Sequence, residues 1–137
     1  MKKSIFFVLC VLLLTSVLTV GAADMSRCDA DGGCAVIEPG NTIKIGMAGP
    51  ITGEYAMYGA DISDAMKISI DELAPLDGFE WELLAEDTLG SAEAAVSVAN
   101  KWITDESLVA VAGNVLTGES AAVIPIFEGA SIPMLSP

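Results

Sequence analysis

The sequence contains no histidine and few basic residues: six lysines and arginines stand against nineteen aspartates and glutamates, which gives a formal net charge of −13. Without an imidazole the chain has no Ser-His or Cys-His nucleophile pair and no histidine-ligated metal site. So few cations cannot form a surface that neutralises phosphates or docks on anionic lipid, and we expect no nucleic-acid binding. A length of 137 residues limits the chain to one domain or less.

Cysteine is also scarce. Cys10 lies in an amino-terminal apolar run, which leaves Cys28 and Cys34 in the stretch that follows. In an oxidising compartment these two residues could close a small disulfide ring, and free thiols are the alternative. A metal site is disfavoured because the spacing matches neither a zinc pattern nor a calcium loop.

The amino terminus has the pattern of a targeting segment. Lys2 and Lys3 precede an apolar run over residues 5–20, and small residues follow at 21–23. This order predicts a signal peptide over residues 1–23 that is cleaved after Ala23. An uncleaved anchor is the alternative, although the run is slightly short for a spanning helix of about 20 residues. Both interpretations place the rest in the periplasm or at the outer face of the cell membrane.

Residues 24–41 are acidic and contain several glycines, which predicts a flexible leader. From residue 42 onward, short β-branched or apolar runs alternate with segments of helical periodicity. Strands are predicted over residues 42–49, 79–87, 108–112 and 132–135. Helices are predicted around residues 62–73, from an N-cap at Ser91 to about Thr104, and from near Ser120, with Pro125 within or just after the first turn.

The patterns also indicate where each element lies. The first helix carries its apolar stripe on Ile62, Ala65, Met66, Ser69, Ile70 and Leu73. Residues 79–87 alternate apolar and glutamate side chains, as in a half-exposed edge strand, whereas residues 108–112 have no polar face, as in a central parallel strand. The order β-α-β-α-β-α-β with short connections predicts an α/β fold with a doubly wound parallel sheet.

In such a sheet, ligands bind at the carboxyl ends of the strands, which here are followed by residues 49–59, 88–91 and 113–120. These loops contain no G-x-G-x-x-G, no P-loop lysine and no G-x-S-x-G elbow. No pair of carboxylates stands out as an acid and base. The loops therefore offer no candidate cofactor site and no candidate catalytic site.

The third loop offers hydroxyls and backbone N–H groups at the start of a helix, which suits a small anion such as a carboxylate. In the alternative interpretation, Thr117 or Ser120 simply caps its own helix. Glu119 would oppose an anion if it pointed inward.

In the first loop, Tyr55 and Tyr58 either contact an organic ligand or only cover the end of the sheet. Asp87 is favoured as a loop-capping carboxylate over a ligand contact.

Several short motifs in the same order carry a family resemblance over residues 42–137. They are Ile43-Lys44-Ile45-Gly46, Gly49-Pro50-Ile51-Thr52-Gly53, Tyr58-Gly59, Glu86-Asp87-Thr88, residues 96–101, Val109-Ala110-Val111-Ala112-Gly113 and residues 132–137. Together they resemble the opening of the branched-chain amino-acid type (Leu/Ile/Val-binding) periplasmic solute-binding proteins of ABC importers. The resemblance implies a type I periplasmic-binding fold, of which this is a partial N-terminal lobe, and delivery of a captured amino acid or analogue to permease subunits.

The resemblance also implies roles for individual residues. Thr117 matches the hydroxyl residue that binds the ligand's α-carboxylate in that family, and Tyr58 matches an aromatic that lines the pocket. Tyr55 and Gly118 complete the candidate site, although Gly118 and Glu119 depart from the family's serine-rich run. The chain is far shorter than known members, so we expect a fragment or truncated product. A ligand-sensing domain of a receptor or regulator is the alternative function, and an enzyme is disfavoured.

Overall fold

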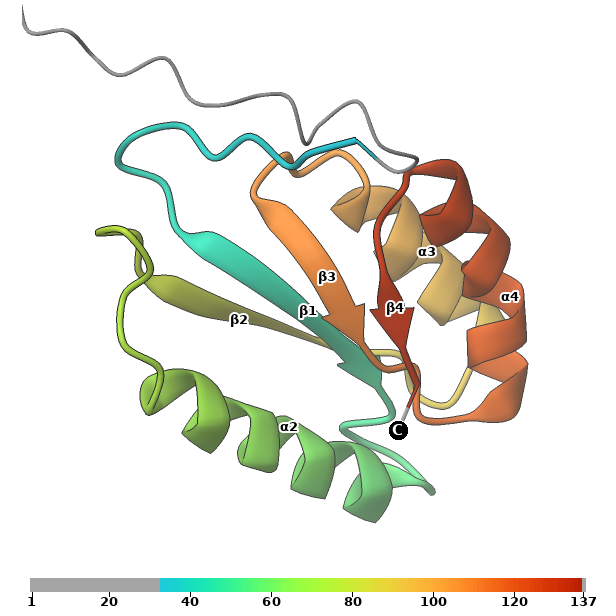
Figure 1. The fold of residues 1–137 in the computed structure, drawn as a ribbon. Coiled ribbons are helices and arrows are strands. Elements are labelled where there is room, and N and C mark those ends of the chain that lie inside the picture. Colours follow the sequence, from blue (N-terminus) through green and yellow to red (C-terminus); the bar gives the residue numbers. More distant parts are fainter. Residues whose placement is uncertain (1–32, 137) are drawn as a thin grey trace, which may run out of the picture.

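The computed structural model describes residues 33–136, so the predicted signal peptide and Cys28 lie outside the described residues. The elements are β1 (Ile43–Gly49), α2 (Ala56–Asp71), β2 (Trp81–Asp87), α3 (Ala92–Trp102), β3 (Leu108–Ala112), α4 (Thr117–Gly129) and β4 (Met134–Leu135). This order confirms the predicted alternation of strands and helices (Figure 1).

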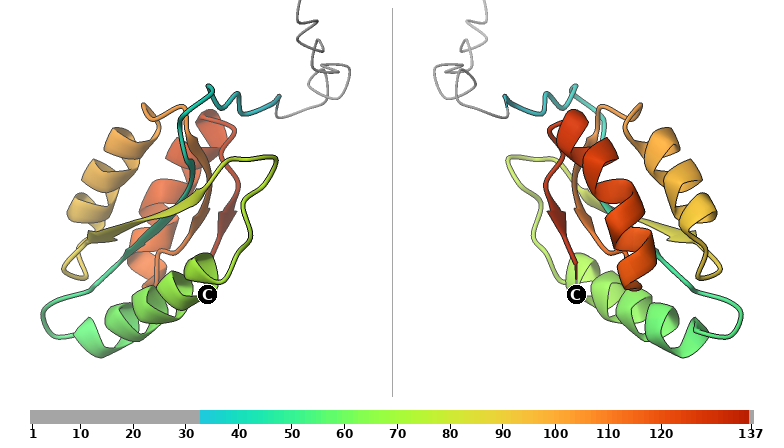
Figure 2. Two further views of the ribbon diagram at one scale, coloured as in Figure 1. Left: turned by 90° about the vertical axis from the view of Figure 1, so that its left-hand side faces the viewer. Right: turned by 90° about the vertical axis from the view of Figure 1, so that its right-hand side faces the viewer.

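The four strands form one parallel sheet in the order β2-β1-β3-β4. The half-exposed run becomes the edge strand β2, and the uniformly apolar run becomes β3 between β1 and β4, as predicted. Helix α2 lies on one face of the sheet, whereas α3 and α4 lie side by side on the other (Figures 1 and 2). The sheet is therefore doubly wound, with its crossovers on both faces.

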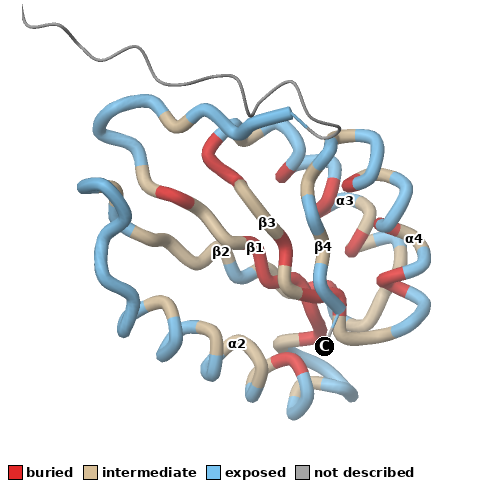
Figure 3. Tube along the Cα trace, in the orientation of Figure 1, coloured by how far each residue is buried: buried red, intermediate tan, exposed pale blue. Residues whose placement is uncertain are grey.

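The hydrophobic core lies between the sheet and the α3–α4 layer. Its buried members are Ala48, Ala95, Val98, Ala99, Trp102, Leu108, Val111, Val123 and Phe127. Trp102 is the largest of them and lies against β1 at Gly46, where a β-carbon would come within 2.6 Å of the indole ring. Figure 3 shows that the buried positions gather in this layer and at the carboxyl ends of β1 and β3.

The opposite face is covered more thinly. Within α2 only Gly59 is buried, and the predicted apolar stripe is confirmed in part: Ile62, Met66 and Ile70 are half-buried, whereas the other three members are exposed. Helix α2 also begins at Ala56, earlier than the predicted loop over residues 49–59 allows. It can do so because a glycine at position 59 lets the helix pass directly over the carbonyl of Pro50.

The two faces of β2 are arranged differently from the prediction. The glutamate-bearing face looks toward α3: Leu84 packs against the core, and Glu86 accepts an ion-paired hydrogen bond from Lys101 of α3 at 2.5 Å. Trp81 and Leu83 lie on the α2 side, in a shallow pocket shared with Ile70. Both faces are thus partly covered, because β2 lies at the sheet edge yet between two helical layers.

The helix ends confirm one prediction and correct another. Ser91 is the N-cap of α3, and its Oγ accepts a hydrogen bond from the Ala94 N–H at 3.4 Å. Helix α4, however, begins at Thr117 rather than near Ser120, so Pro125 lies in its interior rather than in or after its first turn. Proline there leaves the Ala121 carbonyl without a donor, but both residues are exposed and water can hydrate that carbonyl.

Candidate functional site

Three loops from three strands meet at the carboxyl end of the sheet; we call residues 50–55, 88–91 and 113–116 together the loop rim. The loop after β2 crosses the end of β1, where the Thr88 N–H donates to the Gly49 carbonyl at 2.9 Å. Gly90 then lies between Tyr55 and Leu116: a β-carbon there would be 3.1 Å from the Tyr55 ring and 3.4 Å from Leu116. With φ of +75°, Gly90 also has the backbone conformation that favours glycine.

Asp87 joins the first two loops. Its Oδ1 accepts hydrogen bonds from the N–H groups of Ile51 (2.9 Å), Thr52 (3.3 Å) and Leu89 (2.9 Å), and its Oδ2 accepts one from the Thr52 hydroxyl (2.5 Å). Burial alone would raise the pKa of the Asp87 carboxyl, but these hydrogen bonds outweigh it and lower the pKa below its ordinary value. Asp87 is therefore a loop-capping carboxylate, as favoured from the sequence.

This geometry predicts an acid-dependent contribution to stability. Because the folded-state pKa of Asp87 is lowered, its contribution is present above the unfolded pKa of about 3.9 and is lost as pH falls through the folded value. Asp87→Asn should lower the urea midpoint at neutral pH, and the deficit should shrink steadily below about pH 4. Asp61→Asn, which removes an exposed α2 carboxylate, controls for loss of charge alone. A deficit that stays constant down to low pH would contradict the assignment.

The first turn of α4 offers free donors at the loop rim. Leu116 is the extended N-cap residue, and Thr117 and Gly118, both exposed, begin the helix. Among residues 33–136, neither the Thr117 hydroxyl nor the N–H groups of Thr117 and Gly118 have a hydrogen-bond partner. Thr117 does not cap its own helix. Ser120 does not either, since its hydroxyl donates to the Asn114 carbonyl at 2.8 Å. The capping interpretation of both hydroxyls is thus wrong, and the turn is open to an anion.

Beneath this turn lies a buried polar cluster that the sequence did not reveal. Glu119 is 1 % exposed, and its carboxylate accepts hydrogen bonds from the buried Thr88 hydroxyl and, at 3.4 Å, from the Leu116 N–H. Asn114 is equally buried, and its side-chain amide has no partner among the described residues. Glu119 does point inward, but its oxygens engage protein donors. An isolated glutamate in a first helical turn looks like a surface residue, so only its tertiary neighbours distinguish it.

The two tyrosines occupy different positions. Tyr55 is the residue before α2 and lies at the rim beside Gly90, and 42 % of it is exposed. Tyr58 lies in the first turn of α2 rather than in the loop, and it is 55 % exposed on a helix that covers the opposite sheet face from α4. The structure therefore places Tyr55 beside Gly90, whose other neighbour is Leu116 at the start of α4, and it places Tyr58 in α2, outside the loop rim.

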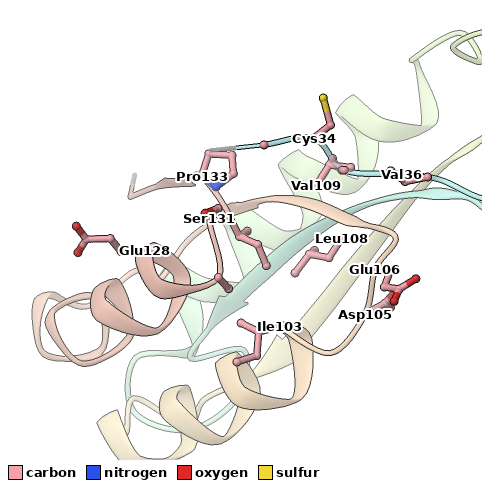
Figure 4. A pocket seen from close by; sticks show the side chains of 14 residues that line it. Cys34, Val36, Ile103, Asp105, Glu106, Leu108, Val109, Glu128, Ser131 and Pro133 are labelled. Carbon is pink, nitrogen blue, oxygen red and sulfur yellow. The ribbon is translucent and has the colours of Figure 1, made fainter. Parts of the chain in front are cut away.

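A groove of about 920 Å³ lies at the other end of the sheet, where the segment before β1 crosses the starts of β3 and β4 (Figure 4). Its lining includes Leu108 and Val109 but also three carboxylates, Asp105, Glu106 and Glu128. Asp105 is ion-paired with Lys44 at 2.7 Å, but Glu106 and Glu128 would repel an anionic ligand. The groove therefore does not suit a ligand that carries a carboxylate.

The remaining sequence expectations concern metal, disulfide and membrane. Within residues 33–136 there is no group of three or more acidic or cysteine side chains placed to hold a metal ion. Cys34 is disulfide-bonded; Cys28 lies outside the described residues, so the pairing of these two residues stays a prediction. In the same part of the chain, no helix is both long and apolar enough to cross a membrane.

The fold and the candidate site define a class: an α/β lobe whose connecting loops meet at the carboxyl ends of its strands. The periplasmic binding protein family matches residues 42–137, and the chain belongs to this family. Its curated relatives include the leucine-, isoleucine-, valine-, threonine- and alanine-binding protein of Pseudomonas aeruginosa, 32 % identical over 101 residues. That match covers 71 % of this chain and 26 % of the relative.

Solved structures of substrate-binding proteins have the same fold. The branched-chain amino acid transporter substrate-binding protein LivJ of Streptococcus pneumoniae, in complex with isoleucine, superposes with a TM-score of 0.66 at 29 % identity, covering 71 % of this chain and 29 % of that one. The leucine-binding protein LivK of Thermotoga maritima gives 0.65 at 30 % identity, with 70 % and 27 % covered. The predicted type I periplasmic-binding fold is confirmed. The chain spans about a quarter of the length of the curated relatives it matches.

Proposed function

We propose that this chain is part of an extracytoplasmic solute-binding protein of an ABC importer, which captures an amino acid and delivers it to permease subunits. Membership of the periplasmic binding protein family supports the class, and the relatives named for leucine, isoleucine and valine support an apolar amino acid as ligand. The signal-peptide pattern of residues 1–23 supports export.

One observation carries the proposal: the open first turn of α4. An amino acid ligand brings a carboxylate, and this turn offers an exposed Thr117 hydroxyl together with N–H groups that have no partner within residues 33–136, at the positive end of a helix. Tyr55, beside the turn, offers an apolar ring edge to the ligand's side chain. Gly118 supports the same function because, without a side chain, it leaves its N–H accessible.

The test is L-leucine titration of the purified protein, followed through the amide resonances of residues 116–119. Thr117→Val should lower the affinity about tenfold, because it removes a hydrogen bond to a charged group, whereas Thr117→Ser should stay within about threefold of the unmodified protein. L-Leucinamide, which lacks the carboxylate, should not bind.

Thr104→Val provides the matched control, since Thr104 follows α3 and its hydroxyl donates only to the Lys101 carbonyl. We expect it to leave the affinity unchanged. Equal binding of L-leucine and L-leucinamide, or shifts confined to residues remote from α4, would rule out the carboxylate site.

A further inference from the structure

Two carboxylates, those of Asp87 and Glu119, connect the loop after β2 to the other two loops of the rim. At the end of β2, Asp87 and Thr88 are consecutive, and they contact opposite neighbours. Asp87 accepts hydrogen bonds from the loop after β1, whereas the Thr88 hydroxyl donates to Glu119 in the first turn of α4. The loop after β2 thus links the other two, although β2 is not adjacent to β3 in the sheet.

Both partners of the second link are buried: Thr88 is 0 % and Glu119 is 1 % exposed. A buried carboxylate is costly unless its oxygens are hydrogen-bonded, and here Oε1 accepts from Thr88 while Oε2 accepts from the Leu116 N–H. Glu119 therefore contacts the residue immediately before Thr117. Its position fixes the backbone from which the donors of the candidate site extend.

We propose that Thr88 and Glu119 form a positioning pair, which holds the first turn of α4 in the orientation needed for ligand binding. The proposal rests on the proposed function of that turn. Glu119 does not contact the ligand itself: its oxygens face protein donors, so it does not repel a carboxylate bound on the outer side of the turn. The pair acts through Leu116 on Thr117, and the effect of breaking it should appear at these two residues.

Thr88→Val is the decisive variant, because valine has the shape of threonine without the hydroxyl. We expect it to lower the L-leucine affinity about fivefold, which corresponds to the loss of one hydrogen bond. Thr88→Ser keeps the hydroxyl and should restore the affinity to within about twofold of the unmodified protein. Rescue by serine separates positioning from a general effect of mutating this buried residue.

Thr42→Val is a matched control. The Thr42 hydroxyl also donates to a glutamate, Glu82, at 2.5 Å, but at the opposite end of the sheet. This variant should not change the affinity. If Thr42→Val and Thr88→Val weaken binding equally, or if Thr88→Val binds as tightly as the unmodified protein, the positioning pair is wrong.

Amide hydrogen exchange gives a second readout that needs no ligand. Because the Leu116 N–H donates to Glu119, Thr88→Val should speed its exchange while leaving that of core residues such as Val111 unchanged, and Thr88→Ser should not. If the unmodified protein binds no L-leucine, the proposed function is wrong, but the exchange rates still show whether Thr88 and Glu119 hold the first turn of α4. If Thr88→Val does not fold, Glu119→Met replaces it, since methionine has a similar length but no oxygen that could accept from Thr88 or Leu116, and it should give the same pattern.

Discussion

Replacing Trp102 by alanine should lower the free energy of unfolding by about 3 to 5 kcal/mol, the cost of removing a buried aromatic ring from a core. Trp102 is 2 % exposed, is the largest fully buried side chain, and lies at the end of α3 against β1. A domain of this size has a total stability of about 5 to 15 kcal/mol, so this one change could unfold it. Urea denaturation followed by circular dichroism measures the loss.

Trp81→Ala is the matched control, because Trp81 lies on the edge strand and is only half-buried. It should cost about 1 to 2 kcal/mol, since less apolar surface returns to water. Gly46 provides a further check: Gly46→Ala should destabilise the unmodified protein but much less the Trp102→Ala variant, because the two residues are in contact. Additive effects, or equal losses at the two tryptophans, would show that Trp102 does not occupy the core as described.

Replacing Gly59 by alanine should also destabilise the protein, by about 2 to 3 kcal/mol, through overpacking. A β-carbon at this position in α2 would come within 2.3 Å of the Pro50 carbonyl oxygen, and a backbone atom cannot move aside as a side chain can. The direction is informative, because alanine normally stabilises a helix interior by about 1 kcal/mol relative to glycine.

Gly129→Ala tests the same exchange where space is open. Gly129 is the last residue of α4, and a β-carbon there would meet no atom within 4 Å. Its effect should be small and should not resemble the loss at Gly59. If Gly59→Ala raises the urea midpoint instead, α2 does not pass over the loop after β1 as closely as the structure indicates.

Much of the fold could be predicted from the sequence because its signals are local. The alternating pattern of residues 79–87 identified an edge strand, and the apolar run 108–112 identified an inner one. Ser91 followed by a helical stripe located the start of α3 to the residue. The helix starts at Ala56 and Thr117 were missed, because the N-cap residues Tyr55 and Leu116 have no side chain that accepts a capping hydrogen bond.

The candidate site was predicted less completely. The sequence located the three loops, because parallel strands of one sheet carry their carboxyl ends to one edge, and the family resemblance pointed to Thr117 in the third loop. It did not reveal that Asp87 and Glu119 join those loops, since the partners of each carboxylate include residues about thirty positions away along the chain. Nor did it separate Tyr55 from Tyr58: once α2 starts at Ala56, Tyr55 remains in the loop and Tyr58 falls in the first turn of the helix.

By itself, then, the sequence determined the order of elements, the parallel sheet and the edge at which its three loops meet, because these follow from periodicities within a few residues. Only the tertiary structure decided that the glutamate-bearing face of β2 turns toward α3, that Gly59 must lack a side chain, and that Glu119 is buried under the turn it stabilises. Each of these features depends on which distant segment packs against the residue. The local sequence pattern does not change with that segment, so it cannot predict the contact.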